Sequence, residues 1–145
     1  MKTLKNNKGA VLVEFVIVVP LLLILIFGSI EFGILFFNKA MITNASREGA
    51  RAGIRYNGTT EVQPDEIEAV VRQYCENNLI TFGTDSPPDA LSVDVERDGT
   101  SAGDALTVTV DYNYGFLVLD RLDFFGKWGF SDGIQLNGQA VMRQE

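Results

Sequence analysis

The sequence predicts an α+β fold, in which a long N-terminal transmembrane helix continues into a small domain with a second helix and a three- to four-stranded antiparallel sheet. Three observations lead to it. Residues 10–37 are almost entirely apolar, residues 64–79 repeat apolar side chains at helical spacing, and later segments alternate apolar and polar residues with period two. The whole chain has 145 residues, which is enough for one small domain besides the N-terminal helix.

The first element is the apolar stretch at residues 10–37. As a helix it would extend roughly 30–40 Å, which is enough to cross a bilayer. Lys2, Lys5 and Lys8 precede it, so we expect the N-terminus in the cytoplasm and residues 38–145 on the other side of the membrane. A cleavable secretory signal would have a shorter apolar core followed closely by small residues, whereas small residues suited to cleavage first occur near Ala45. We therefore expect a retained anchor.

The remaining elements follow from local signals. Pro64-Asp65-Glu66 opens a second helix, because proline suits the first turn and acidic residues favour its N-terminus. Residues 91–97 and 105–112 alternate and form a hairpin around a turn at 98–103, and residues 134–142 supply a third strand. The apolar face of the second helix consists of Ile67, Val70, Val71, Tyr74, Cys75 and Leu79.

Composition excludes several classes of function. The chain has no histidine and a single cysteine, Cys75, so it has neither a Ser-His-Asp triad nor a cysteine-rich metal site. Its net charge of -7 argues against binding to nucleic acid, whose phosphates require a basic surface. The acidic segment 98–104 lacks the spacing of a calcium loop and is better explained as a hairpin turn. We expect no metal, no cofactor and no small-molecule substrate.

A short motif precedes the apolar stretch. A lysine-rich leader ends at Gly9, and Glu14 and Phe15 follow at the start of the helix. This arrangement resembles the type IV prepilin processing site, which a membrane-embedded prepilin peptidase cuts after the glycine. The resemblance implies that residues 1–9 are a leader and that the mature chain starts at Ala10. Glycine presents no side chain to the peptidase and can adopt an extended conformation beside the helix start.

Glu14 would then lie about one helical turn from the new amine of Ala10. The carboxylate could pair with that amine, or with the amine of a neighbouring subunit, and we assign Glu14 and Phe15 to assembly. The alternative is an acid at the membrane surface whose side chain simply reaches water.

The segment from Gly9 to about Gly53 resembles the N-terminal signature of the TadE-like family, pseudopilins of the tight-adherence (Flp) pilus machinery. The resemblance implies a pilin-like extracytoplasmic domain and a non-catalytic role in pilus assembly and adhesion at the bacterial inner membrane. The implied partners are a prepilin peptidase, other pilins and pseudopilins, the inner-membrane pilus platform and membrane lipid. A different class, which the residues leave open, is a signal-anchored periplasmic binding or hydrolase domain unrelated to pili. The resemblance also disfavours a major Flp pilin, because those are much shorter.

The helix beyond the membrane carries small residues at helical spacing, which allow another element to approach closely. That element is either the chain's own sheet, which we favour because a small domain needs this helix to close its core, or a neighbouring subunit. Glu48 and Arg51 stand three residues apart, and Arg47 shares a face with Arg51. The predicted helix-packing interface comprises Ala45, Arg47, Glu48, Gly49, Arg51 and Ala52.

Residues 112–130 are rich in aromatic side chains. We expect most of them to cap the sheet and pack on the second helix, and a remaining exposed cluster near Lys127 and Trp128 to face a partner or the outer membrane leaflet.

Overall fold

A computed structural model describes residues 8–55, 62–81, 91–99, 103–117 and 133–143. Their element order is α1 (Lys8–Gly53), α2 (Pro64–Asn78), β1 (Leu91–Arg97), β2 (Ala105–Tyr114) and β3 (Ile134–Arg143). The three strands form one antiparallel sheet in the order β1-β2-β3. The predicted α+β class, with a long apolar helix, a second helix and a small antiparallel sheet, is therefore confirmed.

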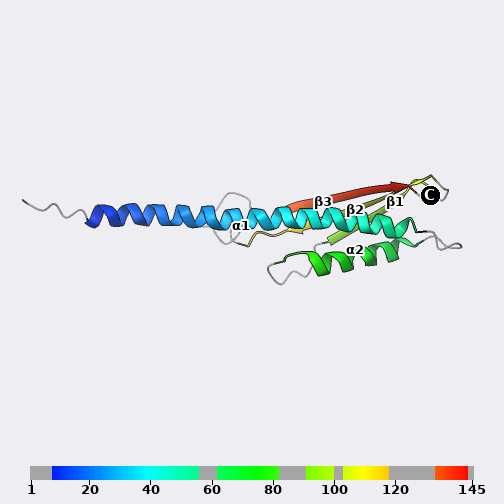
Figure 1. Cartoon of the computed structure of the whole chain (residues 1–145), viewed down its shortest axis with the longest axis horizontal. Helices are drawn as coiled ribbons and strands as arrows, with labels where there is room; N and C mark the ends of the chain where they lie inside the picture. The colour runs from blue at the N-terminus through cyan, green and yellow to red at the C-terminus, as the bar shows by residue number, and fades with distance from the viewer. Residues whose placement is uncertain (1–7, 56–61, 82–90, 100–102, 118–132, 144–145) are drawn as a thin grey trace, which may run out of the picture.

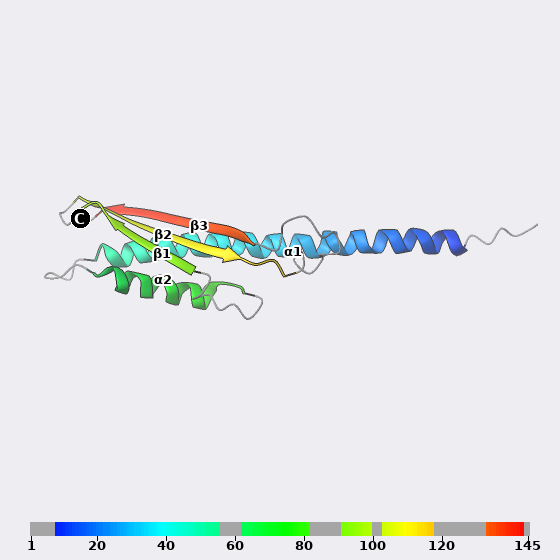
Figure 2. The ribbon, with the colours of Figure 1, turned by 180° about the vertical axis from the view of Figure 1, so that it is seen from behind.

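Helix α1 is the longest element, with 46 residues. Its N-terminal half projects alone, and its C-terminal half lies along the sheet (Figures 1 and 2). Pro20 lies inside the helix and does not interrupt it. A helix makes its interior backbone hydrogen bonds within its own segment, as a bilayer requires of a spanning chain, and Pro20 removes one of them because proline has no backbone N–H.

Helix α2 begins at Pro64, as the sequence predicts, with Asp65 and Glu66 in its first turn. Its buried residues are Ile67, Val71 and Cys75, spaced four apart on the predicted apolar face. The other three residues of that face are only half-buried, because they lie at its margins. A side-chain ion pair between Arg72 and Glu68, 2.7 Å apart, lies at the partly exposed edge of this helix.

Strand β2 is the centre of the sheet and pairs with both neighbours. Val93 of β1 lies opposite Val110 of β2, which in turn lies opposite Gly138 of β3. Burial alternates along β2, so one face of the sheet points to the core and the other to solvent. The observed strand runs two residues beyond the predicted end, to Tyr114, and β3 runs one residue beyond, to Arg143.

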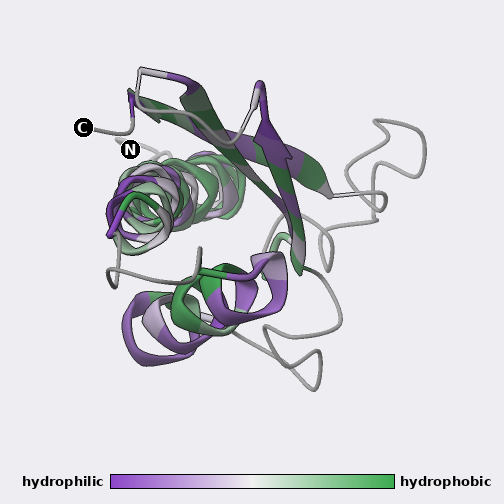
Figure 3. Cartoon of the chain, turned by 90° about the vertical axis from the view of Figure 1, so that its right-hand side faces the viewer, coloured by the Kyte–Doolittle hydropathy of each residue, from purple (hydrophilic) through white to green (hydrophobic). Residues whose placement is uncertain are grey.

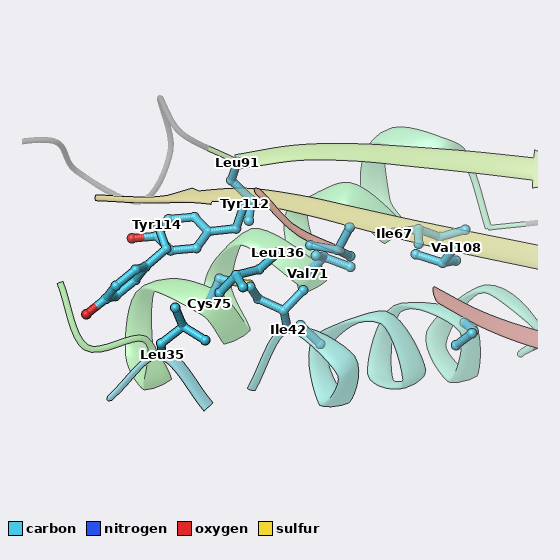
Figure 4. Close-up of a cluster of buried hydrophobic side chains, with 14 of the residues drawn as sticks. Leu35, Ile42, Ile67, Val71, Cys75, Leu91, Val108, Tyr112, Tyr114 and Leu136 are labelled. Atoms are coloured by element: carbon cyan, nitrogen blue, oxygen red, sulfur yellow. The ribbon is translucent and has the colours of Figure 1, made fainter. Parts of the chain in front are cut away.

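Both helices cover the same face of the sheet (Figure 3). The apolar core lies between them and the strands, and Figure 4 shows Ile42 of α1, Val71 of α2 and Val108 of β2 within it. Strand β3 approaches α1 closely at Gly138, where an added Cβ would lie 2.8 Å from Ile42 Cγ2 and 2.9 Å from its backbone. Glycine at this position therefore sets how near the helix can lie to the sheet.

Candidate functional site

The first candidate surface is the part of α1 that precedes the folded domain. The exposed large apolar side chains from Val11 to Ile30 are each 43–67% exposed. Within the described residues, α1 is the helix that is long and apolar enough to cross a membrane. Apolar side chains on every side of a helix are stable in hydrocarbon and unfavourable in water.

The predicted processing site lies at the start of this helix. Helix α1 begins at Lys8, so Gly9 and Ala10 both have helical backbone. An extended conformation at Gly9, which glycine allows, therefore requires the start of α1 to unwind. The N–H groups of a first helical turn have no partners within the helix, so unwinding that turn breaks few hydrogen bonds. Glu14 and Phe15 are exposed one and one and a half turns later.

The six residues predicted to pack the helix differ in exposure and form three pairs. Ala45 and Gly49 are buried, Glu48 and Ala52 are half-buried, and Arg47 and Arg51 are exposed. A Cβ added at Gly49 would lie 2.5 Å from Val71 Cγ2 and 3.3 Å from Val108 Cγ1. The small side of this helix thus contacts α2 and β2 of the same chain, whereas the arginines face solvent. The alternative named above, in which the small-residue side of this helix packs on a neighbouring subunit, remains a prediction.

A buried acid, which the sequence analysis did not single out, lies where the domain first meets α1. Glu31 is 2% exposed, and its carboxylate Oε1 accepts a hydrogen bond from the backbone N–H of Leu117. Tyr114 lies in the same region and is also 2% exposed. Burial raises the pKa of the Tyr114 hydroxyl, and the negative charges of Glu31 and Tyr112 raise it further. Phe116 packs edge-on against the Tyr114 ring, with 5.7 Å between the ring centroids.

A buried amide, also missed, lies two turns further along the helix. Asn38 is fully buried, and its Nδ2 donates a hydrogen bond of 2.8 Å to the carbonyl of Ile80. The N–H of Ile80 donates in return to Asn38 Oδ1, at 3.0 Å. Beside it, Lys39 Nζ donates to the carbonyl of Asn137 in β3. These hydrogen bonds attach Ile80, just after α2, and Asn137, near the start of β3, to two adjacent residues of α1.

Among the described residues, neither Cys75 nor the connection between β1 and β2 forms a catalytic or metal-binding arrangement. Cys75 is buried, and burial raises the pKa of its thiol to about 11, so it is a weak nucleophile near neutral pH. Asp98 N–H donates to the carbonyl of Ala105 at 3.0 Å and closes the β1–β2 connection. In the described part of the chain no group of three metal-ligating side chains occurs.

The predicted aromatic cluster is only partly described. Tyr112, Tyr114 and Phe116 are buried in the core, on the sheet side that faces the helices. Phe124, Phe125, Lys127, Trp128 and Phe130 lie outside the described residues.

A comparison with protein families tests the TadE-like resemblance, and its match lies within α1. A family model described as TadE-like protein matches residues 9–51. The TadE-like resemblance of the N-terminal segment is thereby confirmed. The TadE-like segment includes Gly9, Glu14 and the packing residues up to Arg51, whereas α2 and the sheet follow it. Neither a curated protein nor a solved structure matches the chain.

Proposed function

We propose that this chain is a membrane-anchored minor pseudopilin, a non-catalytic assembly or structural component of a tight-adherence (Flp) pilus. One observation carries the proposal. The TadE-like match at residues 9–51 coincides with a single continuous helix that is exposed and apolar in its first half and packed on the domain in its second half. Such a helix can hold a folded domain at the membrane and can also pack beside other pilin helices.

The same geometry supports the proposed processing step. Cleavage after Gly9 would leave the amine of Ala10 about 6 Å along the helix axis from Glu14, one turn away. A free ammonium and a free carboxylate are both costly at the edge of the hydrocarbon, so their pairing is favourable. Within one chain this pair stabilises the helix start, and between two chains it sets the register of one subunit on the next. The N-terminus would lie in the cytoplasm and the domain outside the inner membrane.

Deletion of the gene in the source bacterium tests this role. We expect the deletion strain to lose surface pili, measured by electron microscopy and in the sheared fraction, and to attach poorly to surfaces. The intact chain supplied from a plasmid should restore both, and it serves as the control. Fractionation of the complemented strain then separates a subunit of the fibre from a component that stays in the membrane. Normal piliation in the deletion strain would contradict the proposal.

A further inference from the structure

Exposed apolar side chains of the folded domain are not spread evenly. Among the described residues that follow α1, the large apolar side chains classed as exposed are Ile80 (37%), Leu117 (43%), Ile134 (39%) and Val141 (59%). The backbone N–H of Leu117 donates a hydrogen bond to Glu31, which fixes Leu117 beside that residue. The backbone N–H of Ile80 donates to Asn38 in the same way. Both therefore lie at the end of the domain that is nearer to the apolar half of α1.

Ile134 lies at that end too. It is the first residue of β3, opposite Tyr114. Gly138, four residues later, contacts Ile42 of α1. Four strand residues cover about 13 Å, which equals roughly nine residues of helix, so Ile134 lies level with about Gly33. Val141, by contrast, is near the far end of the same strand, opposite Thr107.

Helix α1 adds aromatic side chains at the same level. The exposed fractions are 49% for Phe32, 68% for Phe36 and 41% for Phe37. Glu31 and Leu35, on the side of the helix that faces the domain, are buried. The basal surface of the domain consists of Phe32, Phe36, Phe37, Ile80, Leu117 and Ile134.

The length of the helix places this surface relative to a bilayer. From Ala10 to Ile30 there are 21 residues, which as a helix cover about 31 Å, close to the thickness of the hydrocarbon core. The predicted spanning segment, residues 10–37, would continue to Phe37. The end of β2 would then lie inside the hydrocarbon, because Leu117, which follows β2, is hydrogen-bonded to Glu31. The segment that fits the fold therefore ends at Ile30. The basal surface then begins at the hydrocarbon edge with Phe32 and Leu117 and extends about 12 Å outward to Ile80, beside Asn38, at the water-facing side of the headgroup layer.

We propose that the basal surface is a lipid-contacting surface, which seats the folded domain in the headgroup layer of the membrane leaflet on the domain's side. The proposal rests on the membrane anchoring proposed above. Aromatic and aliphatic side chains are stable at the boundary between hydrocarbon and water. Because α1 continues without a break from this surface into the folded domain, contact of the surface with lipid would fix the tilt of the domain.

Site-specific labelling of the full chain in vesicles tests this. In a Cys75→Ala background, Ile134→Cys, Ile80→Cys, Val141→Cys and Leu22→Cys would each carry an environment-sensitive nitrobenzoxadiazole label. The vesicles would contain phosphatidylcholine alone, phosphatidylcholine with a lipid that bears a nitroxide quencher near its headgroup, or phosphatidylcholine with a lipid that bears the nitroxide in the middle of its acyl chain. We expect blue-shifted, quenchable emission at positions 134 and 80 and water-like, unquenched emission at position 141. Leu22 reports whether the helix spans, and equal thermal melting of the labelled variants controls for folding.

The outcomes separate the two proposals. Quenching of label 22 by the acyl-chain nitroxide, with labels 134 and 80 behaving like label 141, would overturn the lipid contact and leave the anchor intact. A label at position 22 that the acyl-chain nitroxide does not quench would overturn the anchor itself. Blue-shifted but unquenched labels at 134 and 80 would show that protein, such as a second copy of the chain, covers the basal surface, and would also overturn the lipid contact.

Discussion

At the scale of single residues, two glycines of α1 meet different surroundings. A Cβ added at Gly33 would have nothing within 4 Å, whereas one added at Gly49 would lie 2.5 Å from Val71 Cγ2. Alanine is more favourable than glycine inside a helix by roughly 0.5–1 kcal/mol. The two positions therefore separate helix propensity from packing on α2.

We expect Gly49→Ala to lower the melting temperature of the purified chain in detergent, because the clash with Val71 outweighs the gain in propensity. Gly49→Leu should overpack the core further and cost roughly 1–3 kcal/mol of unfolding free energy. Gly33→Ala is the matched control and should leave the melting temperature unchanged or raise it. An unchanged melting curve for Gly49→Leu would show that α2 does not pack here and would favour a contact with another subunit.

The buried thiol of Cys75 predicts a pH dependence of stability. Its pKa is about 11 in the folded chain and 9.0 in an unfolded one, so the unfolded state ionises first as the pH rises. The stability from this group is fully present below pH 9.0 and is lost between about pH 9 and 11. We expect the melting temperature to fall over this window, and to fall less steeply in Cys75→Ala. Equal slopes in the two proteins would contradict the prediction.

Two acids of α1 are predicted to differ in role. Glu14 is exposed, whereas Glu31 is buried against Leu117. Glu14→Ala should leave the thermal melting of the domain unchanged while pilus output and cross-linking between pseudopilins fall, because we assign its carboxylate to assembly. Glu31→Ala is the comparison variant and should lower the melting temperature, since Leu117 N–H loses its acceptor. Normal piliation in Glu14→Ala would mean that this acid is only a tolerated charge.

At the scale of elements, the sequence was sufficient wherever the signal was local. Pro64-Asp65-Glu66 marked the start of α2, and alternation marked β1 at its observed bounds. Strand β2 was predicted two residues short, because Asn113 is exposed and Tyr114 is an aromatic residue that we assigned to the following cluster. Such boundaries depend on pairing with β3, which a single strand's pattern does not contain.

The buried contacts of Glu31 and Asn38 were not predictable in the same way. Their partners, Leu117 and Ile80, lie 86 and 42 positions away in the sequence, and the bonds go to backbone groups that any residue carries. A signal was nevertheless present for Glu31. An acid that ends an apolar run is costly unless it has a partner, which the sequence analysis considered for Glu14 alone.

The start of α1 carries the next prediction. We expect the mature chain to begin at Ala10 in cells that contain a prepilin peptidase, and intact-mass measurement of the membrane-extracted protein checks this. Gly9→Leu should retain the leader, because a large side chain blocks the cleavage site. The structure adds that the first helical turn must unwind for cleavage, since Gly9 lies within α1. A chain that starts at Met1, or is cut near Ala45, would contradict the assignment.

At the scale of the whole molecule, anchor and domain share one helix without a joint between them (Figure 1). The domain packs on this helix from Glu31 onward, through Leu35 and Asn38. A boundary drawn at residue 38 therefore divides the core, whereas a boundary at residue 31 keeps it whole. A rigid connection of this kind means that any tilt of the helix in the membrane also turns the domain.

Three fragments test where the folded domain begins. A fragment of residues 31–145 keeps Leu35 in the core and the bond from Leu117 to Glu31. A fragment of residues 38–145 loses both, so we expect it to be less stable by about 3–6 kcal/mol, from the burial of one leucine and a hydrogen bond to a charged group. A fragment of residues 24–145 is the control: it adds residues that are mostly exposed and should match the stability of 31–145. Urea unfolding in mild detergent measures all three. Equal midpoints for the fragments that start at 31 and at 38 would show that the first turns of α1 beside the domain contribute no stability, and would return the boundary to residue 38.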